Sequence, residues 1–188
     1  MTHMVTSPPA VEPVSVAELR AQVRLVHTQE DALLEHYIKA ARQHVEALTR
    51  RALITQTLQV MLDAWPAGRA VRLPVGPVQD VLAVNLMDGD GVPQPLPSGA
   101  WRFYRGSEPG SLRAAPGMGP VEPVNGIQIE FIAGYGADGS SVPEPLRQAI
   151  LLLAAHWYEN REASVEFGNG TMPQALDRLL STYRLVLL

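Results

Sequence analysis

The stretch that decides the fold runs from Pro143 to Glu162 and reads PEPLRQAILLLAAHWYENRE. It opens with a proline, which is tolerated in the first turn of a helix because an amide hydrogen there would have no partner. Apolar residues then recur at helical spacing on one face: Leu146, Ile150, Leu153, Ala154 and Trp157. The sequence therefore predicts an amphipathic helix with one buried face.

Two helices are predicted upstream of this stretch. Ser15 and Glu18 form an S-x-x-E capping box, which indicates a short helix through about Leu25. From about Thr28 through about Arg50, a second set of apolar residues falls at helical spacing: Leu34, Tyr37, Ile38, Ala41, Val45 and Leu48. This pattern predicts a longer helix, again with one buried face.

The C-terminal part of the chain predicts a short closing helix and an apolar tail. A break at Gly168–Gly170 precedes a T-x-x-Q cap, Thr171 with Gln174, for a helix through about Arg184. The last residues, 185–188, read LVLL and fit no periodic pattern. Four exposed aliphatic side chains are a liability on a solitary protein, so the tail either folds back onto the helices or binds a partner.

Between the helices the sequence changes character and predicts strands. The candidate strands are rich in β-formers and cover residues 55–62, 71–73, 78–87, 101–104 and 127–132. Turn residues separate them, including Pro66-Ala-Gly68, Gly76-Pro77, Asp88-Gly-Asp90-Gly91 and Glu108-Pro-Gly110. Residues 55–133 are therefore predicted to form a small antiparallel β-subdomain of five to seven short strands.

The expected fold class is α+β, a helical-bundle frame with an inserted small antiparallel β-subdomain. Its parts in chain order are an extended N-terminal arm (residues 1–14), N-terminal helices (15–54), the β-subdomain (55–133), C-terminal helices completing the bundle (134–184) and the apolar tail (185–188). At 188 residues the chain is long enough for one substantial core.

Composition excludes several classes of protein. The formal net charge is −4, which does not fit a protein whose main task is to grip phosphate backbones. The chain contains no cysteine, so disulfides and thiolate zinc sites are excluded. Its longest apolar run, residues 149–155, is far too short to span a membrane. Basic residues are scattered, and Arg42, Arg50 and Arg51 are expected to be solvent-exposed near the end of the second helix.

A search for reactive residues finds none, so no catalytic, cofactor-binding or metal-binding residue is predicted. Asp88-Gly-Asp90-Gly91 shares the start of a calcium loop but lacks its later ligands, and a hairpin turn explains it better. His156 and Glu159 lie three apart on a helix, yet no partner helix offers matching ligands. Neither a phosphate-binding G-x-x-x-x-G-K-[ST] loop nor a G-x-S-x-G nucleophile motif occurs.

Trp157 and Tyr158 are adjacent in the predicted helix, so their side chains point about 100° apart and cannot both face the core of the monomer. Tyrosine and tryptophan are favoured at protein interfaces. Two alternatives follow: one ring packs inward while the other lies at a subunit interface, or the two occupy the core and its edge.

Four motifs carry a family resemblance: the stretch from Pro143 to Glu162, LDRLLSTYR at 176–184, FIAGYG at 131–136 and RALITQT at 51–57. With them, the chain resembles the head–tail connector (adaptor) proteins of long-tailed phages and gene transfer agents. The resemblance spans about Pro8 to Arg184. It implies a structural, non-enzymatic protein of the virion neck that is made in the host cytoplasm, binds no cofactor and does not associate with a membrane.

The resemblance also implies partners. Connector proteins assemble as a homo-oligomeric ring, commonly a dodecamer, beneath the portal protein, and they dock the next tail component, a stopper or tail terminator. DNA passes through the lumen without sequence-specific binding. By location alone, the residues expected to reach the portal are Tyr183, Arg184, Leu185, Val186, Leu187 and Leu188. Trp157 or Tyr158 is expected at the interface between subunits.

Two other functions are alternatives to the connector interpretation. The first is a nucleic-acid-binding module in the β-subdomain, where Trp101, Phe103 and Tyr104 lie beside Arg102 and Arg105. On one strand these side chains alternate between faces, so at most two aromatic rings and one arginine share a surface. The second is an enzyme with a dispersed site, which His156 or Glu159 would have to serve.

Overall fold

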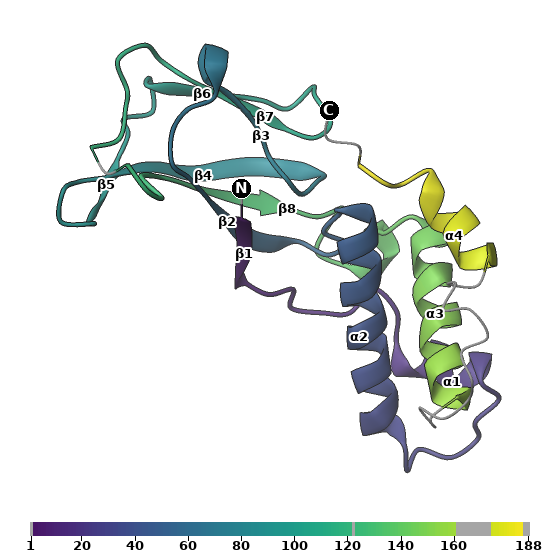
Figure 1. Ribbon diagram of the computed structural model, residues 1–188. Coiled ribbons are helices and arrows are strands. Elements are labelled where there is room, and N and C mark those ends of the chain that lie inside the picture. Colours follow the sequence, from purple (N-terminus) through teal and green to yellow (C-terminus); the bar gives the residue numbers. More distant parts are fainter. Residues whose placement is uncertain (1, 122, 161–173, 186–188) are drawn as a thin grey trace. The chain divides into compact units, whose positions relative to one another are not determined.

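The computed structural model describes residues 2–121, 123–160 and 174–185 as a mixture of α-helices and antiparallel sheets, which confirms the α+β class (Figure 1). The chain divides into two compact units. The β unit comprises the described residues of Met1–Ala10, Thr55–Tyr135 and Leu185–Leu188. The helical unit comprises those of Val11–Ile54 and Gly136–Arg184.

The described helices of the helical unit are α1 (Val16–Gln22), α2 (Asp31–Thr49), α3 (Glu144–Glu159) and α4 (Gln174–Ser181). A short 3-10 helix, η2 (Gly139–Ser141), precedes α3. The capping box predicted for α1 is confirmed, because the Ser15 hydroxyl accepts from the Glu18 amide and the Glu18 carboxylate accepts from the Ser15 amide. The cap predicted at Thr171 lies outside the described residues.

The core of the helical unit comes from the faces predicted by periodicity. Helices α2 and α3 pack against each other (Figure 1). Their fully buried residues include Leu34, Ile38, Ala41 and Val45 of α2 and Leu146, Ala149, Ile150 and Ala154 of α3. Burying one large aliphatic side chain stabilises a fold by about 1.5–3 kcal/mol, so this apolar seam is the main stabilising contact of the unit.

The expectation that Arg42 is solvent-exposed is wrong, because only 4% of this residue is exposed. Its guanidinium lies 2.7 Å from a Glu12 carboxylate oxygen and 2.6 Å from one of Glu46. Glu46 in turn accepts from the amide of Leu53 at 2.9 Å. A buried charge is tolerated only when it is paired, and here the pairing ties the segment before α1 to the end of α2.

The β unit contains two antiparallel sheets, seen one above the other within the unit in Figure 1. The five-stranded sheet has the order β1-β2-β8-β4-β5, formed by Thr2–Ser7, Gln56–Leu62, Ile127–Ala133, Val78–Met87 and Pro93–Pro95. The three-stranded sheet has the order β3-β7-β6, formed by Ala70–Arg72, Ser111–Ala114 and Trp101–Tyr104. A short 3-10 helix, η1 (Ala67–Arg69), precedes β3.

Alternation along the strands sets the core of the β unit. In β2 and β8 every second residue is buried, and the register places Leu58 opposite Phe131 and Val60 opposite Ile129. The three-stranded sheet contributes buried Val71, Leu112 and Ala114. Since side chains of a strand point alternately to opposite faces, each sheet has one buried and one outer face.

Strand β1 was not predicted, because the sequence indicated only an extended arm over residues 1–14. Thr2–Ser7 pairs antiparallel with β2 and forms an edge of the five-stranded sheet. From His3 to Ser7 its side chains are exposed, Met4 by 57% and Val5 by 50%. Backbone hydrogen bonds rather than apolar burial hold this strand, and no hydrophobic pattern could therefore reveal it.

Candidate assembly surfaces

An aromatic cluster joins α2 to α3 in the helical unit, formed by Tyr37, His44, Trp157 and Tyr158. The Tyr37 and Tyr158 rings meet edge to face with centroids 6.4 Å apart, and the His44 and Trp157 rings do so at 6.0 Å. Tyr37 and His44 lie seven residues apart, about two helical turns, so both project from one side of α2. Trp157 and Tyr158 therefore pack against the same side of α2.

Neither Trp157 nor Tyr158 is fully buried, since both are of intermediate exposure. The prediction that the two could not both face the core agrees with this arrangement. Part of each ring surface stays accessible at the C-terminal end of α3. Half-buried aromatic rings of this kind are suited to an interface, because they bring large apolar area at little cost in side-chain entropy.

Of the six C-terminal residues expected to contact a partner, the structure describes Tyr183, Arg184 and Leu185. The Tyr183 carbonyl accepts from Arg51 Nε at 2.6 Å, which makes Arg51 half-buried rather than solvated, while Arg50 is exposed. Arg184 pairs with Asp177 at 2.8 Å. Leu185, in the β unit, is half-buried, and its Cδ1 lies 3.2 Å from where a Cβ on Gly76 would sit. Val186, Leu187 and Leu188 lie outside the described residues.

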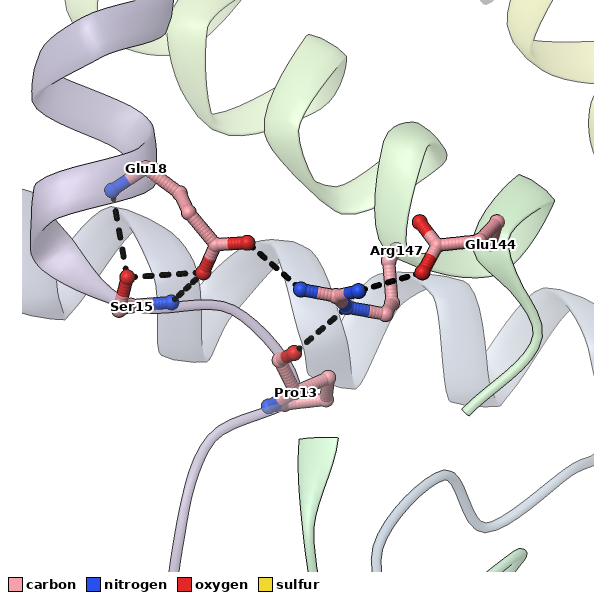
Figure 2. Close-up of polar contacts among 5 residues, drawn as sticks. All are labelled: Pro13, Ser15, Glu18, Glu144 and Arg147. Carbon is pink, nitrogen blue, oxygen red and sulfur yellow. Dashed lines mark hydrogen bonds and ion pairs between the residues drawn. The ribbon is translucent and has the colours of Figure 1, made fainter. Parts of the chain in front are cut away.

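Arg147 holds α1 in place beside α3 (Figure 2). Its guanidinium lies 2.6 Å from Glu18 Oε1 and 2.6 Å from Glu144 Oε1, and its Nε donates to the Pro13 carbonyl at 3.1 Å. The pKa of Glu18 is lowered, first by the hydrogen bond from the Ser15 amide, then by the Ser15 hydroxyl, and less by the charge of Arg147. We call this set, Pro13, Ser15, Glu18, Glu144 and Arg147, the arginine clamp.

The segments considered for metal binding have structural roles. Asp88 lies in the β4–β5 hairpin, as the sequence predicted. Its carboxylate accepts hydrogen bonds from the amides of Asp90 and Val92 at 3.0 and 2.9 Å. The pKa of Asp88 is lowered first by the bond from the Val92 amide, then by one from the Gln94 side chain, and less by the bond from the Asp90 amide. His156 lies at the end of α3, where Asn160 donates to its carbonyl at 2.8 Å. Among the described residues, no three His, Asp or Glu side chains are grouped so as to hold a metal ion.

The aromatic and basic cluster at 101–105 is divided between two faces, as alternation predicted. Trp101 and Phe103 are half-buried, while Arg102 and Tyr104 are exposed on the outer face of the three-stranded sheet. Arg105 pairs with Asp80 at 3.1 Å and lies over the Phe103 ring. The sequence did not reveal that β3 and β7 add Arg72 and Arg113 to the same outer face; only the strand register shows this.

Comparison with protein families matches the chain to the phage gp6-like head-tail connector proteins over residues 13–84 and 122–184. These two ranges together cover well over half of the chain. The chain belongs to this family. The gap in the match, residues 85–121, falls within the β unit and takes in the end of β4 together with β5, β6 and β7.

Solved structures support the connector assignment. A chain from the neck of an empty gene transfer agent particle, computed with C6 symmetry, is 34% identical, with a TM-score of 0.84 over 100% of this chain and 97% of that one. A chain from the virion of a native gene transfer agent particle is also 34% identical, with a TM-score of 0.82 and the same coverage. A third, from the native neck computed with C12 symmetry, is 34% identical, with a TM-score of 0.77 over 98% and 97%.

The protein is therefore a head–tail connector, a structural component of a virion neck and not an enzyme. A comparison with curated proteins finds no match. No helix in the described parts of the connector is long and apolar enough to cross a membrane.

Proposed function

We propose that the connector assembles as a closed homo-oligomeric ring, a dodecamer, that docks on the portal protein and receives the next tail component. The observation that carries this proposal is its likeness, over nearly the whole of both chains, to proteins in particle necks computed with C6 and C12 symmetry. DNA passes through the lumen of this ring without sequence-specific contacts. The helical unit is its bundle frame, and the β unit is an insertion into that frame.

A ring requires a heterologous interface, in which two different surfaces of neighbouring subunits meet and the rotation closes. The helical unit offers such surfaces in the exposed side of α2 and in the rings of Trp157 and Tyr158. Both residues keep accessible area after packing against α2. We assign Trp157 and Tyr158 to the subunit interface on this basis.

The portal contact is assigned to Tyr183, Arg184, Leu185, Val186, Leu187 and Leu188. The Arg51 bond to the Tyr183 carbonyl and the Arg184 pair with Asp177 fix the start of this segment. The apolar residues that follow supply the kind of surface that becomes buried at the centre of an interface.

The test is the mass of the purified connector by light scattering and its electron microscopy, with and without the cognate portal. A closed ring, alone or only on the portal, is expected. A variant ending at Arg184 is expected to keep its fold and to lose portal binding, whereas Val26→Ser, which changes an apolar side chain that is 96% exposed, binds as the wild type does. A monomer that ignores the portal overturns the proposal, and a truncated protein that still binds it overturns the assignment of the tail.

A further inference from the structure

The outer face of the three-stranded sheet in the β unit concentrates positive charge. Arg102 of β6 and Arg113 of β7 are directly opposite each other in the strand register. Strand β3 adds Arg72, whose partner position is Ser111. All three arginines and Tyr104 are exposed on this side, whereas Val71, Leu112 and Ala114 are buried on the other. We call Arg72, Arg102, Arg113 and Tyr104 the arginine face.

This arrangement costs the sheet stability, because like charges directly opposite each other on neighbouring strands repel. Within the described chain, neither Arg102 nor Arg113 has an ion pair or a hydrogen bond to its side chain. The remaining positions on this side are Ala70 and Ser111, so the described face carries no carboxylate of its own. The opposed Arg102 and Arg113 are thus a local conflict without compensation inside the described chain, which is typical of a functional surface, whereas Arg72 has a partner within the chain.

We propose that the arginine face contacts the phosphate backbone of double-stranded DNA. A guanidinium group forms paired hydrogen bonds with a phosphate group, and a tyrosine hydroxyl can donate to one. Neighbouring strands lie about 5 Å apart, so Arg102 and Arg113 lie side by side, and Arg72 lies two residues further along the face, level with Ser111. The three arginines therefore form a compact patch rather than scattered charges. This inference rests on the proposed function, which brings DNA into the ring.

A protein partner fits this surface less well. Protein interfaces have a core depleted of charge and enriched in apolar side chains. The arginine face offers only Ala70 and Tyr104 besides its charged and hydroxyl groups. The net charge of −4 also means that the rest of the connector repels DNA, which keeps the contact local and weak. Contacts to phosphates carry no base readout, and they leave DNA free to slide.

The test measures binding of the intact connector to a short fluorescein-labelled DNA duplex by anisotropy across a range of KCl concentrations. The variant is Arg102→Gln with Arg113→Gln, which removes the opposed pair. The matched control is Arg24→Gln with Arg178→Gln, which removes two exposed charges from the helical unit. Urea unfolding checks each fold, and the sheet variant is expected to be at least as stable as the wild type because the repulsion is gone.

For the sheet variant, the slope of log K against log salt is expected to fall by about 1.8, and affinity at 0.1 M salt to fall roughly tenfold or more. The control is expected to bind as the wild type does. If the sheet variant binds DNA as tightly as the wild type does, the inference is overturned. It is also overturned if the sheet variant keeps DNA binding but loses portal binding, because the arginine face would then contact an acidic protein. Ring formation is measured separately by light scattering and electron microscopy. If rings form but the sheet variant binds DNA as the wild type does, only this inference is refuted. If no ring forms, the proposed function is refuted.

Discussion

At the scale of single residues, Arg147 connects α3 to α1 and to the segment that precedes α1. Arg147→Gln removes both ion pairs of the arginine clamp and the bond to the Pro13 carbonyl. The side chains of Glu18 and Glu144 are 40% and 79% exposed, so solvent screens their ion pairs and losing these pairs costs little stability. The Pro13 carbonyl, in contrast, loses a hydrogen-bond donor. We expect unfolding in urea to become easier by about 1–2 kcal/mol. The exposed control Arg178→Gln should change stability by less than about 0.5 kcal/mol, and an equal loss in both variants would contradict a specific clamp.

The pKa of Glu18 makes the same clamp sensitive to acid. Its pKa is lowered from the ordinary value of 4.5 in the folded protein. A carboxylate with a depressed folded pKa stabilises the fold fully above its unfolded pKa and loses that contribution as the pH falls through the folded pKa. The stability advantage of the wild type over Glu18→Gln should therefore be constant above about pH 5 and shrink below pH 4.5. Urea unfolding of both proteins across this range tests it, and an advantage that does not vary with pH would contradict it.

At the scale of elements, the β6–β7 hairpin offers a paired test of packing in the β unit. A Cβ on Gly110 would lie 2.9 Å from both Phe103 Cε2 and Val78 Cβ, whereas a Cβ on Gly106 would have no atom within 4 Å. Gly110→Ala should therefore destabilise the β unit by about 1–3 kcal/mol through overpacking. Gly106→Ala, in the same hairpin, should be neutral or slightly stabilising. Urea unfolding followed by far-UV circular dichroism measures both, and equal effects would place the strain elsewhere.

Elements differ in how far the sequence predicted them. The long helices follow from apolar periodicity, and α2 ends at Thr49, one residue before the predicted end. Strands β5 and β7 were missed because their residues, PQP and SLRA, include no β-branched or aromatic side chain, and missing β7 also hid Arg113 from the arginine face. Arg42 was predicted to be solvated because a helix face indicates burial only of apolar residues, whereas its burial depends on Glu12, distant in sequence.

At the scale of the whole molecule, the family and its role in the neck could be predicted from the sequence, but the side-chain clusters on its surface could not. The apolar motifs that carry the resemblance specify a fold, and the fold is shared with neck proteins at 34% identity. Surfaces depend on register and on side chains brought together from separate elements. The arginine face needs three strands, and the aromatic cluster needs two helices.

The aromatic cluster also allows a test that separates assembly from folding. Tyr37→Ala and Tyr158→Ala remove the same edge-to-face pair from opposite sides, so each should cost about 0.5–1.5 kcal/mol of monomer stability for that pair, in addition to the loss of the apolar area that its own ring buries. If Tyr158 also contacts the neighbouring subunit, only its removal should weaken the ring, by about tenfold in the concentration needed for assembly. Light scattering over a dilution series measures this concentration. Equal weakening by both variants would mean that the cluster acts only within the subunit, and the ring contact would then have to lie on another face of α2 or α3.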